Sequence, residues 1–164
     1  MALSEPLAWD PGEPSIDYLL GRGRIERTQP SVQVARQLLS QAGLHVASAR
    51  ILATTPDATM AFAAAYDAAR KALTAILATQ GLRPKAGDGG HLVLLDVLRP
   101  QFPSYRKELL RFDWLRTVRN GSQYPDIDTA PVTAQDIEDA IMASCDIVQL
   151  ARAFLATRLS ELTP

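Results

Sequence analysis

The amino-acid sequence predicts an all-α protein, a single domain built as a four- to five-helix antiparallel bundle. Three observations lead to this prediction. The chain has 164 residues, which suits one domain, and hydrophobic residues make up 47% of them. Alanine is abundant while aromatic residues make up only 6%, a composition that favours close-packed helices. Several long segments repeat apolar residues with helical spacing, and none alternates with period two for long enough to predict a strand.

The first 29 residues are expected to form an N-terminal arm that carries one short helix. Residues 1–14 combine prolines, a glycine and acidic residues, which predicts an irregular chain. Ser15 can cap a short helix that runs to Leu20, and the glycines that follow would end it. Residues 30–164 form the predicted helical bundle.

Two long helices are predicted next, over residues 32–53 and 58–80. In the first, apolar residues recur at i, i+3 and i+4, although Gly43 permits a bend in its middle. Thr55 or Asp57 can cap the second helix, whose alanines let a neighbouring helix approach closely. The predicted buried stripe of this second helix is Phe62, Tyr66, Ala69, Leu73, Ile76 and Leu77.

Three further elements complete the predicted bundle: two helices, over residues 104–119 and 133–159, and an element over 91–100, whose run "HLVLLDVL" is ambiguous between helix and strand. The loop "GLRPKAGDGG" precedes the element over 91–100, and "PQFP" separates it from the next helix. Thr133 opens the last helix, because "TAQD" resembles a capping box with aspartate in place of glutamate. The predicted buried side of the 104–119 helix is Leu109, Leu110, Trp114 and Val118.

Charge is nearly balanced over the whole chain but not along it. The formal net charge is −1, so the average requires neither a nucleic acid nor an anionic membrane as partner. Basic residues gather between positions 99 and 119, and acidic residues dominate from 120 onward. The two segments would either pair as weak surface charges or present a basic helix to a partner. The basic residues are Arg99, Arg106, Lys107, Arg111, Arg116 and Arg119.

Few residues indicate catalytic or metal chemistry by their pattern. Cys145 is the only cysteine, which excludes a disulfide framework and a cysteine-based zinc site. His45 falls in a helical stripe and His91 at a helix start, and neither belongs to a nucleophile motif, so structural roles are expected. The run "GDGGH" at 87–91 lacks the ending of a P-loop and is predicted to be a turn. We therefore expect no metal and no cofactor.

The sequence also indicates the compartment. No apolar run reaches the roughly 20 residues of a membrane span. The acidic, proline-containing N-terminus lacks the basic start and apolar core of a signal peptide. We expect a cytoplasmic protein with no membrane partner.

The stretch "LRTVRNGSQYP", residues 115–125, has two interpretations. Basic residues complement the dipole at a helix end, and Asn-Gly is a good left-handed stop, so the stretch can be a plain helix terminus. On the same helix, however, Asp113, Arg116 and Asn120 share one face, and Arg119 projects nearby. That arrangement is typical of a site that binds an anion.

This stretch and two others resemble the HEPN superfamily, small all-α proteins that include many ribonucleases and toxins of prokaryotic toxin–antitoxin and defence systems. The other two are "AAYDAARKALTAILATQGLRP" and "GGH", and the helix order agrees from about residue 30 to 159. The family's signature is an arginine, a polar residue that is usually asparagine, and a histidine four to six positions after the arginine. Here the pattern is Arg-Asn, three residues, then Tyr-Pro.

The resemblance implies roles by position: Arg119 would hold the scissile phosphate, Asn120 is the polar residue beside it, and Tyr124 stands where histidine is usual. In such proteins two protomers pack with their motifs facing across a cleft, and the histidine assists metal-independent attack by the RNA's own 2′-hydroxyl. Tyrosine, with an ordinary pKa of about 10, is a poor base at neutral pH but can bind a phosphate or stack on a base. The implied RNA-binding residues are Arg116, Arg111, Lys107 and Arg106.

The resemblance therefore implies an RNA-directed homodimer, a toxin-type metal-independent endoribonuclease with a variant active site. A non-catalytic interaction module is the alternative, in which the basic helix binds RNA or an acidic protein. HEPN proteins are often encoded beside a minimal nucleotidyltransferase that acts as antitoxin, in some cases by modifying a tyrosine near the motif, and Tyr124 would be available to it. A third alternative, a helical domain that binds a small molecule, has only the alanine-lined helix faces in its favour.

Overall fold

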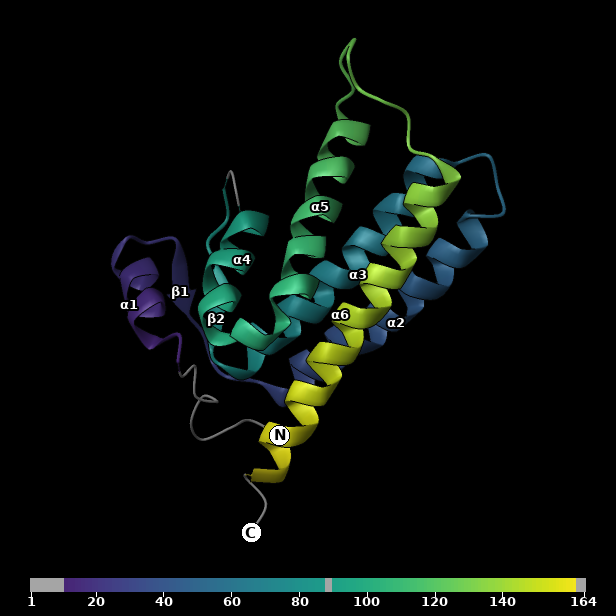
Figure 1. Ribbon diagram of the computed structural model, residues 1–164. Helices are drawn as coiled ribbons and strands as arrows, with labels where there is room; N and C mark the ends of the chain where they lie inside the picture. The colour runs from purple at the N-terminus through teal and green to yellow at the C-terminus, as the bar shows by residue number, and fades with distance from the viewer. Residues whose placement is uncertain (1–10, 88–89, 162–164) are drawn as a thin grey trace.

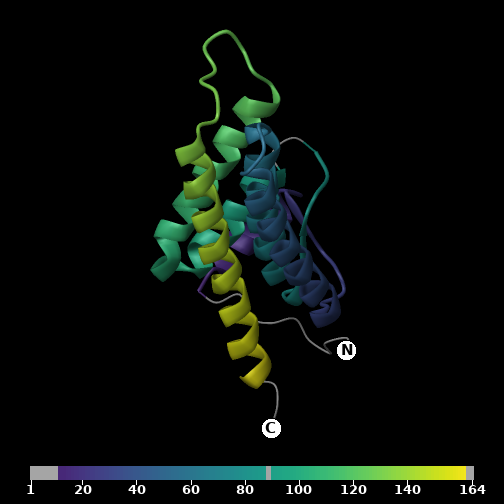
Figure 2. The same cartoon turned by 90° about the vertical axis from the view of Figure 1, so that its right-hand side faces the viewer.

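The computed structural model describes residues 11–87 and 90–161 and confirms the all-α class (Figure 1). Helix α3 lies at the centre of an elongated bundle and packs against α2, α5 and α6, while α4 packs on α5 and α1 on α4. Figure 2 shows α2 and α6 running side by side along one flank. The helices are α1 (Glu13–Gly21), α2 (Val32–Leu52), α3 (Ala58–Thr79), α4 (Gly90–Gln101), α5 (Arg106–Gln123) and α6 (Ala134–Glu161), with a 3-10 turn, η1 (Pro103–Tyr105), before α5.

Helix α3 is the centre of the core because its small residues let three helices approach it. Every residue of the predicted stripe is buried, and several alanines between them have no exposed surface. Burying a side chain such as Phe62 or Leu73 contributes about 2 to 3 kcal/mol. The helix begins at Asp57, whose carboxylate accepts a hydrogen bond from the Met60 amide at 3.1 Å. This satisfies one of the free amides of the first turn.

The long helices α2 and α6 also follow the predictions closely. Helix α2 continues through Gly43 without a break. At the start of α6, the Thr133 hydroxyl accepts from the Asp136 amide at 3.1 Å, and an Asp136 carboxylate oxygen accepts from the Thr133 amide at 2.8 Å. This reciprocal pair is the predicted capping box.

Helix α5 differs from the prediction at its C-terminal end. It continues through Asn120 and Gly121 to Gln123. Among the described residues, positive φ angles occur only at Gly23, Gly81 and Gly87, so the Asn-Gly pair does not form the left-handed stop that it favours. The Ser122 hydroxyl donates to the Arg119 carbonyl at 2.9 Å, which supports this last turn.

The buried face of α5 is also rotated from the predicted one. Leu109 is buried as predicted, but Leu110 is 51% exposed, and the fully buried residues beside Leu109 are Phe112 and Leu115. These positions follow one another at i, i+3 and i+6, which is the stripe that actually faces α3. Trp114 and Val118 pack at its edge and are partly buried.

Two short strands, which the sequence did not predict, join the N-terminal segment to the bundle. Strand β1 (Ile25–Arg27) pairs antiparallel with β2 (Leu82–Pro84). Each has three residues, too few for alternation to be recognised. Gly81 makes the turn into β2 with a φ of +65°, and a Cβ atom there would stand 2.9 Å from the Thr28 carbonyl oxygen.

The described part of the N-terminal segment packs on the bundle. Ile16 and Leu19 of α1 are buried in the main core. The helix starts three residues earlier than predicted: Gly12 is its N-cap, and Pro14 occupies the first turn, where proline's missing amide hydrogen costs nothing. Ser15, the predicted cap, is therefore inside the helix. Residues 1–10 of the predicted irregular arm lie outside the described residues.

By length and composition, α6 is apolar enough to cross a membrane between Ala134 and Ser160. Within the bundle, however, it places Ala140, Ala143 and Ile147 in the core with no exposed surface. These residues of α6 therefore contribute to the core of the bundle.

Candidate functional site

Two adjoining cavities lie between α3, the C-terminal half of α5 and the start of α4. We call the first, of about 530 Å³, the motif cavity, and the second, of about 720 Å³, the histidine cavity. Arg70, His91 and Arg119 line both of them. The motif cavity is also lined by Thr74, Lys85, Arg116 and Asn120, and the histidine cavity by His45, Ser48, Tyr66, Asp67 and Gln123.

Tyr66 connects the parts of this site. Its ring is 2% exposed and stacks on Phe112 with centroids 5.7 Å apart. The Arg119 guanidinium lies 5.7 Å from the centroid of the same ring, a cation–π contact. The hydroxyl makes a short hydrogen bond with Nδ1 of His91. Tyr66 thus fixes the positions of one arginine and one histidine.

Arg119 differs from the other arginines of the site in what balances its charge. Arg116 makes two hydrogen bonds to one Asp113 oxygen, at 3.1 Å from Nε and 2.9 Å from Nη2. Arg70 is held by Asp67 in the same way, with 2.8 Å from its Nε. Within the described chain, no carboxylate lies at ion-pair distance from Arg119, which reaches only the Asn120 side-chain oxygen at 3.4 Å. An anion entering the motif cavity would meet this unneutralised guanidinium.

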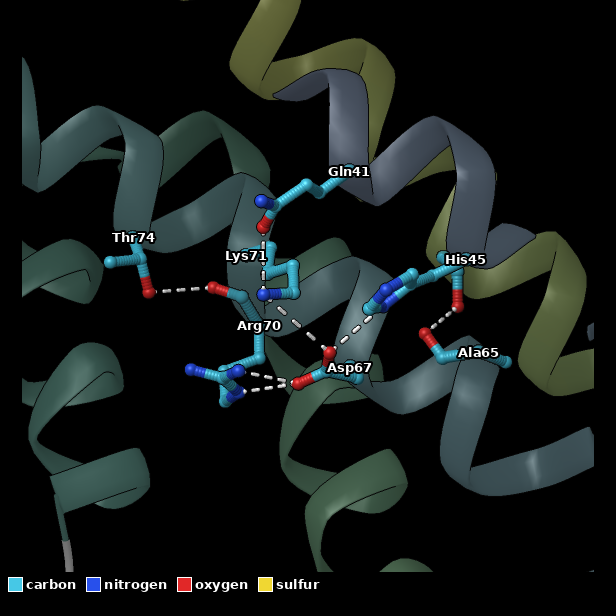
Figure 3. A network of polar contacts seen from close by, with 8 residues as sticks. Gln41, His45, Ala65, Asp67, Arg70, Lys71 and Thr74 are labelled. Carbon is cyan, nitrogen blue, oxygen red and sulfur yellow. Dashed lines mark hydrogen bonds and ion pairs between the residues drawn. The ribbon is translucent and has the colours of Figure 1, made fainter. Parts of the chain in front are cut away.

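His45 is oriented by a carboxylate at the rim of the histidine cavity. Its Nδ1 lies 2.8 Å from Oδ2 of Asp67, and the other oxygen of this carboxylate accepts a hydrogen bond from Arg70 (Figure 3). Lys71 approaches the same carboxylate at 3.9 Å and also bonds the Gln41 side chain. Burial raises the pKa of Asp67, but the hydrogen bond and charge of Arg70, with the charges of Lys71 and His45, outweigh it and lower that pKa overall.

His91 lies among cations rather than beside a carboxylate. Burial first, and then the charges of Arg70 and Arg119, lower the pKa of His91 below its ordinary value near 6.5. Its ring is therefore neutral at pH 7. Burial likewise raises the pKa of Tyr66 to about 12, although Arg70 and Arg119 oppose that rise. The Tyr66 hydroxyl therefore keeps its proton at neutral pH.

The structure brings some of the sequence-predicted residues together and leaves others apart. Arg119, Asn120 and Arg116 line the motif cavity. Tyr124 ends α5, is 79% exposed, and is outside the lining of both cavities. Arg111 pairs instead with Asp146 of α6 at 2.6 Å. Arg106 and Lys107 are exposed in the first turn of α5, roughly 18 to 20 Å along the helix from Arg119.

Sequence reasoning missed four contributors: Tyr66 and Arg70, and both histidines as members of one site. Tyr66 was assigned to the core stripe, which is correct for its ring but overlooks its hydroxyl. His91 and His45 were assigned structural roles because no catalytic pattern includes either of them. The available signal was the helical spacing of Tyr66, Asp67 and Arg70, which places three polar groups on adjacent turns of an alanine-rich helix.

The fold and site define a small helical domain with an anion-receptive cavity at an Arg-Asn pair. The family model of the HEPN domain matches residues 35–154, which include both cavities, and the chain belongs to this family. No curated protein and no solved structure matches it. Among the described residues, no group of three or more histidine, cysteine or acidic side chains is placed to hold a metal ion.

Proposed function

We propose that this protein is RNA-directed and acts as a metal-independent endoribonuclease of the toxin type, within a toxin–antitoxin or defence system. The position of Arg119 carries the proposal. Its guanidinium stands in a cavity with Arg70 and Arg116, and it lacks a carboxylate partner in the described part of the chain. A phosphodiester would supply that missing anion through charge-assisted hydrogen bonds. Asn120, beside it, would orient the phosphate.

Tyr124 and a second protomer would complete the RNA-binding surface. The exposed Tyr124 ring follows the last cavity-lining turn of α5. A base of the bound strand would stack on it where the RNA leaves the cavity. In the homodimer expected of this family, a second motif would face the first across the cleft. No cofactor enters the proposal.

Cleavage in the presence of a chelator tests this proposal. A mixed pool of tRNA and mRNA would be incubated with the parent protein and with Arg119→Ala, Tyr124→Phe and Arg36→Ala. We expect the parent to cleave the RNA. The cleavage rate of Arg119→Ala should be lower by about 100-fold or more, because the charge developing on the phosphate is no longer stabilised. Arg36→Ala is the matched control, since Arg36 is exposed on α2 and is outside the lining of both cavities. Equal cleavage by Arg119→Ala and Arg36→Ala contradicts the proposal.

A non-catalytic interaction module is the second candidate, and the exposure of Tyr124 favours it. A hydroxyl on a ring that is 79% exposed is accessible to a modifying enzyme such as a minimal nucleotidyltransferase antitoxin. RNA binding without cleavage, together with nucleotide transfer from ATP to Tyr124 by such a partner, would support this candidate. Mass spectrometry of the parent beside Tyr124→Phe detects the transfer, and an unmodified Tyr124 excludes it.

A further inference from the structure

The two histidines of this chain line one cavity. The sequence holds only two, and they come from different helices: His45 from α2 and His91 from α4. Both line the histidine cavity together with Arg119 and Arg70. Neither belongs to the motif segment, where Tyr124 occupies the position that usually holds histidine. The cavity thus already contains the side chain that best transfers protons at neutral pH, in two copies.

The two histidine rings differ in the charge of their neighbours, as a catalytic base and a catalytic acid require. His91 faces Tyr66, Arg70 and Asp67 of α3 and Arg116 and Arg119 of α5, a mostly cationic set that lowers its pKa. A ring kept neutral in this way is a proton acceptor. His45 instead has the ionised Asp67 carboxylate at 2.8 Å from its Nδ1. The two rings of one cavity therefore have different neighbours: mostly cations at His91, and a carboxylate at His45.

The hydrogen bonds of the two Nδ1 atoms leave both Nε2 atoms for substrate. The Asp67 carboxylate accepts from Nδ1–H of His45. The Tyr66 hydroxyl oxygen can accept from Nδ1–H of His91 both before and after Nε2 takes a proton. Asp67 and Tyr66 are therefore positioning residues, because each acts through the histidine that it holds.

We propose that His91 is the proton acceptor and His45 the proton donor of the RNA cleavage assigned above to Arg119, a role that rests on the proposed function. The 2′-oxygen attacks phosphorus, and its proton goes to Nε2 of His91. The P–O5′ bond breaks, and O5′ takes a proton from Nε2 of protonated His45. The products are a 2′,3′-cyclic phosphate and a 5′-hydroxyl, and exchange with water restores both rings. Arg119 stabilises the charge that grows on the non-bridging oxygens.

Two substrates that differ only in leaving group separate the two roles. One is an RNA pool, and the other is the set of nucleoside 3′-(4-nitrophenyl phosphates), whose nitrophenolate departs without needing a proton. We expect the cleavage rate of His91→Gln to fall by about 10²- to 10⁴-fold on both substrates, as for removal of a general base. We expect the rate of RNA cleavage by His45→Ala to fall by a similar factor. Its rate on the nitrophenyl esters should stay within about tenfold of the parent's.

Three further variants show whether the loss comes from chemistry. His91→Gln keeps an amide that can bond the Tyr66 hydroxyl, so it is preferred over His91→Ala, which would leave that buried hydroxyl without a partner. Tyr66→Phe should shift the acidic limb of the pH–rate profile, and a purely structural role would not move that limb. Arg36→Ala serves as the control for folding and basal activity, because Arg36 is exposed on α2 and is outside the lining of both cavities. Thermal unfolding and RNA affinity are measured for each variant.

The outcomes distinguish this inference from the function on which it rests. If Arg119→Ala abolishes cleavage while both histidine variants cleave like the parent, the histidine assignment is overturned and the ribonuclease stands. If His45→Ala loses as much on the nitrophenyl esters as on RNA, the donor role of His45 is wrong. A parent that cleaves neither substrate overturns both proposals.

Discussion

At the residue scale, Tyr66 shows how a core position can also organise a site. Its ring fills the space between Phe112 and Arg119, and this packing is what excludes water from it. Its hydroxyl, at the end of a buried ring, meets His91 instead of solvent. Because the phenolate would lose its hydration there, burial raises the pKa of Tyr66 to about 12. The burial that stabilises the core therefore also keeps the Tyr66 hydroxyl, the hydrogen-bond partner of His91, protonated.

The raised pKa of Tyr66 predicts how stability falls in alkali. An unfolded Tyr66 titrates at its ordinary value of 10.0, whereas the folded one titrates near 12. The unfolded state therefore loses this proton first, and the stabilisation is complete below pH 10 and lost as the pH rises to 12. We expect a loss on the order of 2 to 3 kcal/mol in the free energy of unfolding across this interval. Denaturant unfolding at a series of pH values measures it.

Tyr66→Phe and Tyr124→Phe form a matched pair for that measurement. Both remove one hydroxyl, but only the first removes it from the core. The alkaline loss should shrink in Tyr66→Phe and persist in Tyr124→Phe. An unchanged alkaline slope in Tyr66→Phe would assign the loss to other groups.

At the scale of elements, the short β1–β2 pair holds the N-terminal segment to the bundle, and Gly81 controls its geometry. The pair aligns Ile25 with Pro84, and Thr28 donates its amide to the Gly81 carbonyl at 2.9 Å. Gly81 has a φ of +65°, and a side chain there would meet the Thr28 oxygen and Pro30. Both the backbone angle and the space therefore require glycine at this position.

Substitution of Gly81 by alanine should be strongly destabilising. The left-handed angle costs about 1 to 2 kcal/mol for a residue with a Cβ atom, and the backbone contact adds to that cost. We expect at least about 2 kcal/mol of lost stability, or a fall in Tm of about 4 to 8 °C. Gly21→Ala is the control, because Gly21 ends α1 at negative φ with open space around it. Similar thermal unfolding of the two variants would contradict this account.

The sequence predicted an element correctly where one physical signal determined its structure. The prediction was wrong where two signals favoured different structures. The stripe of α3 and the capping box at Thr133 were predictable because burial and capping both act locally. The end of α5 was not, since Asn-Gly favours a stop while the helix continues to Gln123, with the Ser122 hydroxyl bonded to the Arg119 carbonyl in its last turn. The site followed the same rule. Arg119 could be found from its motif, but its meeting with His91 depends on how α4 packs on α5.

At the scale of the whole molecule, the charge distribution would confine the proposed RNA binding to one part of the surface. The net charge is −1, so the protein as a whole does not attract a polyanion. Aspartates partly neutralise Arg70 and Arg116, whereas no carboxylate of the described chain pairs with Arg119 or with Lys85, which lines the same cavity. Lys107, by contrast, lies at the other end of α5, roughly 18 Å along the helix. A short strand bound at the motif cavity would leave Lys107 uncovered.

The salt dependence of RNA affinity tests how far along α5 the bound strand reaches. Each phosphate neutralised on a single strand contributes about 0.7 to the slope of log K against log salt concentration. With a short oligonucleotide, we expect Arg119→Ala to reduce the magnitude of the slope by about 0.7 and Lys107→Ala to leave it unchanged. With a longer strand, Lys107→Ala should reduce it as well, because Lys107 belongs to the predicted RNA-binding set. Fluorescence anisotropy at several salt concentrations measures both slopes, with Arg36→Ala on α2 as the control. A slope that depends on Lys107 but not on Arg119 would move the binding surface away from the motif cavity and onto the first turn of α5.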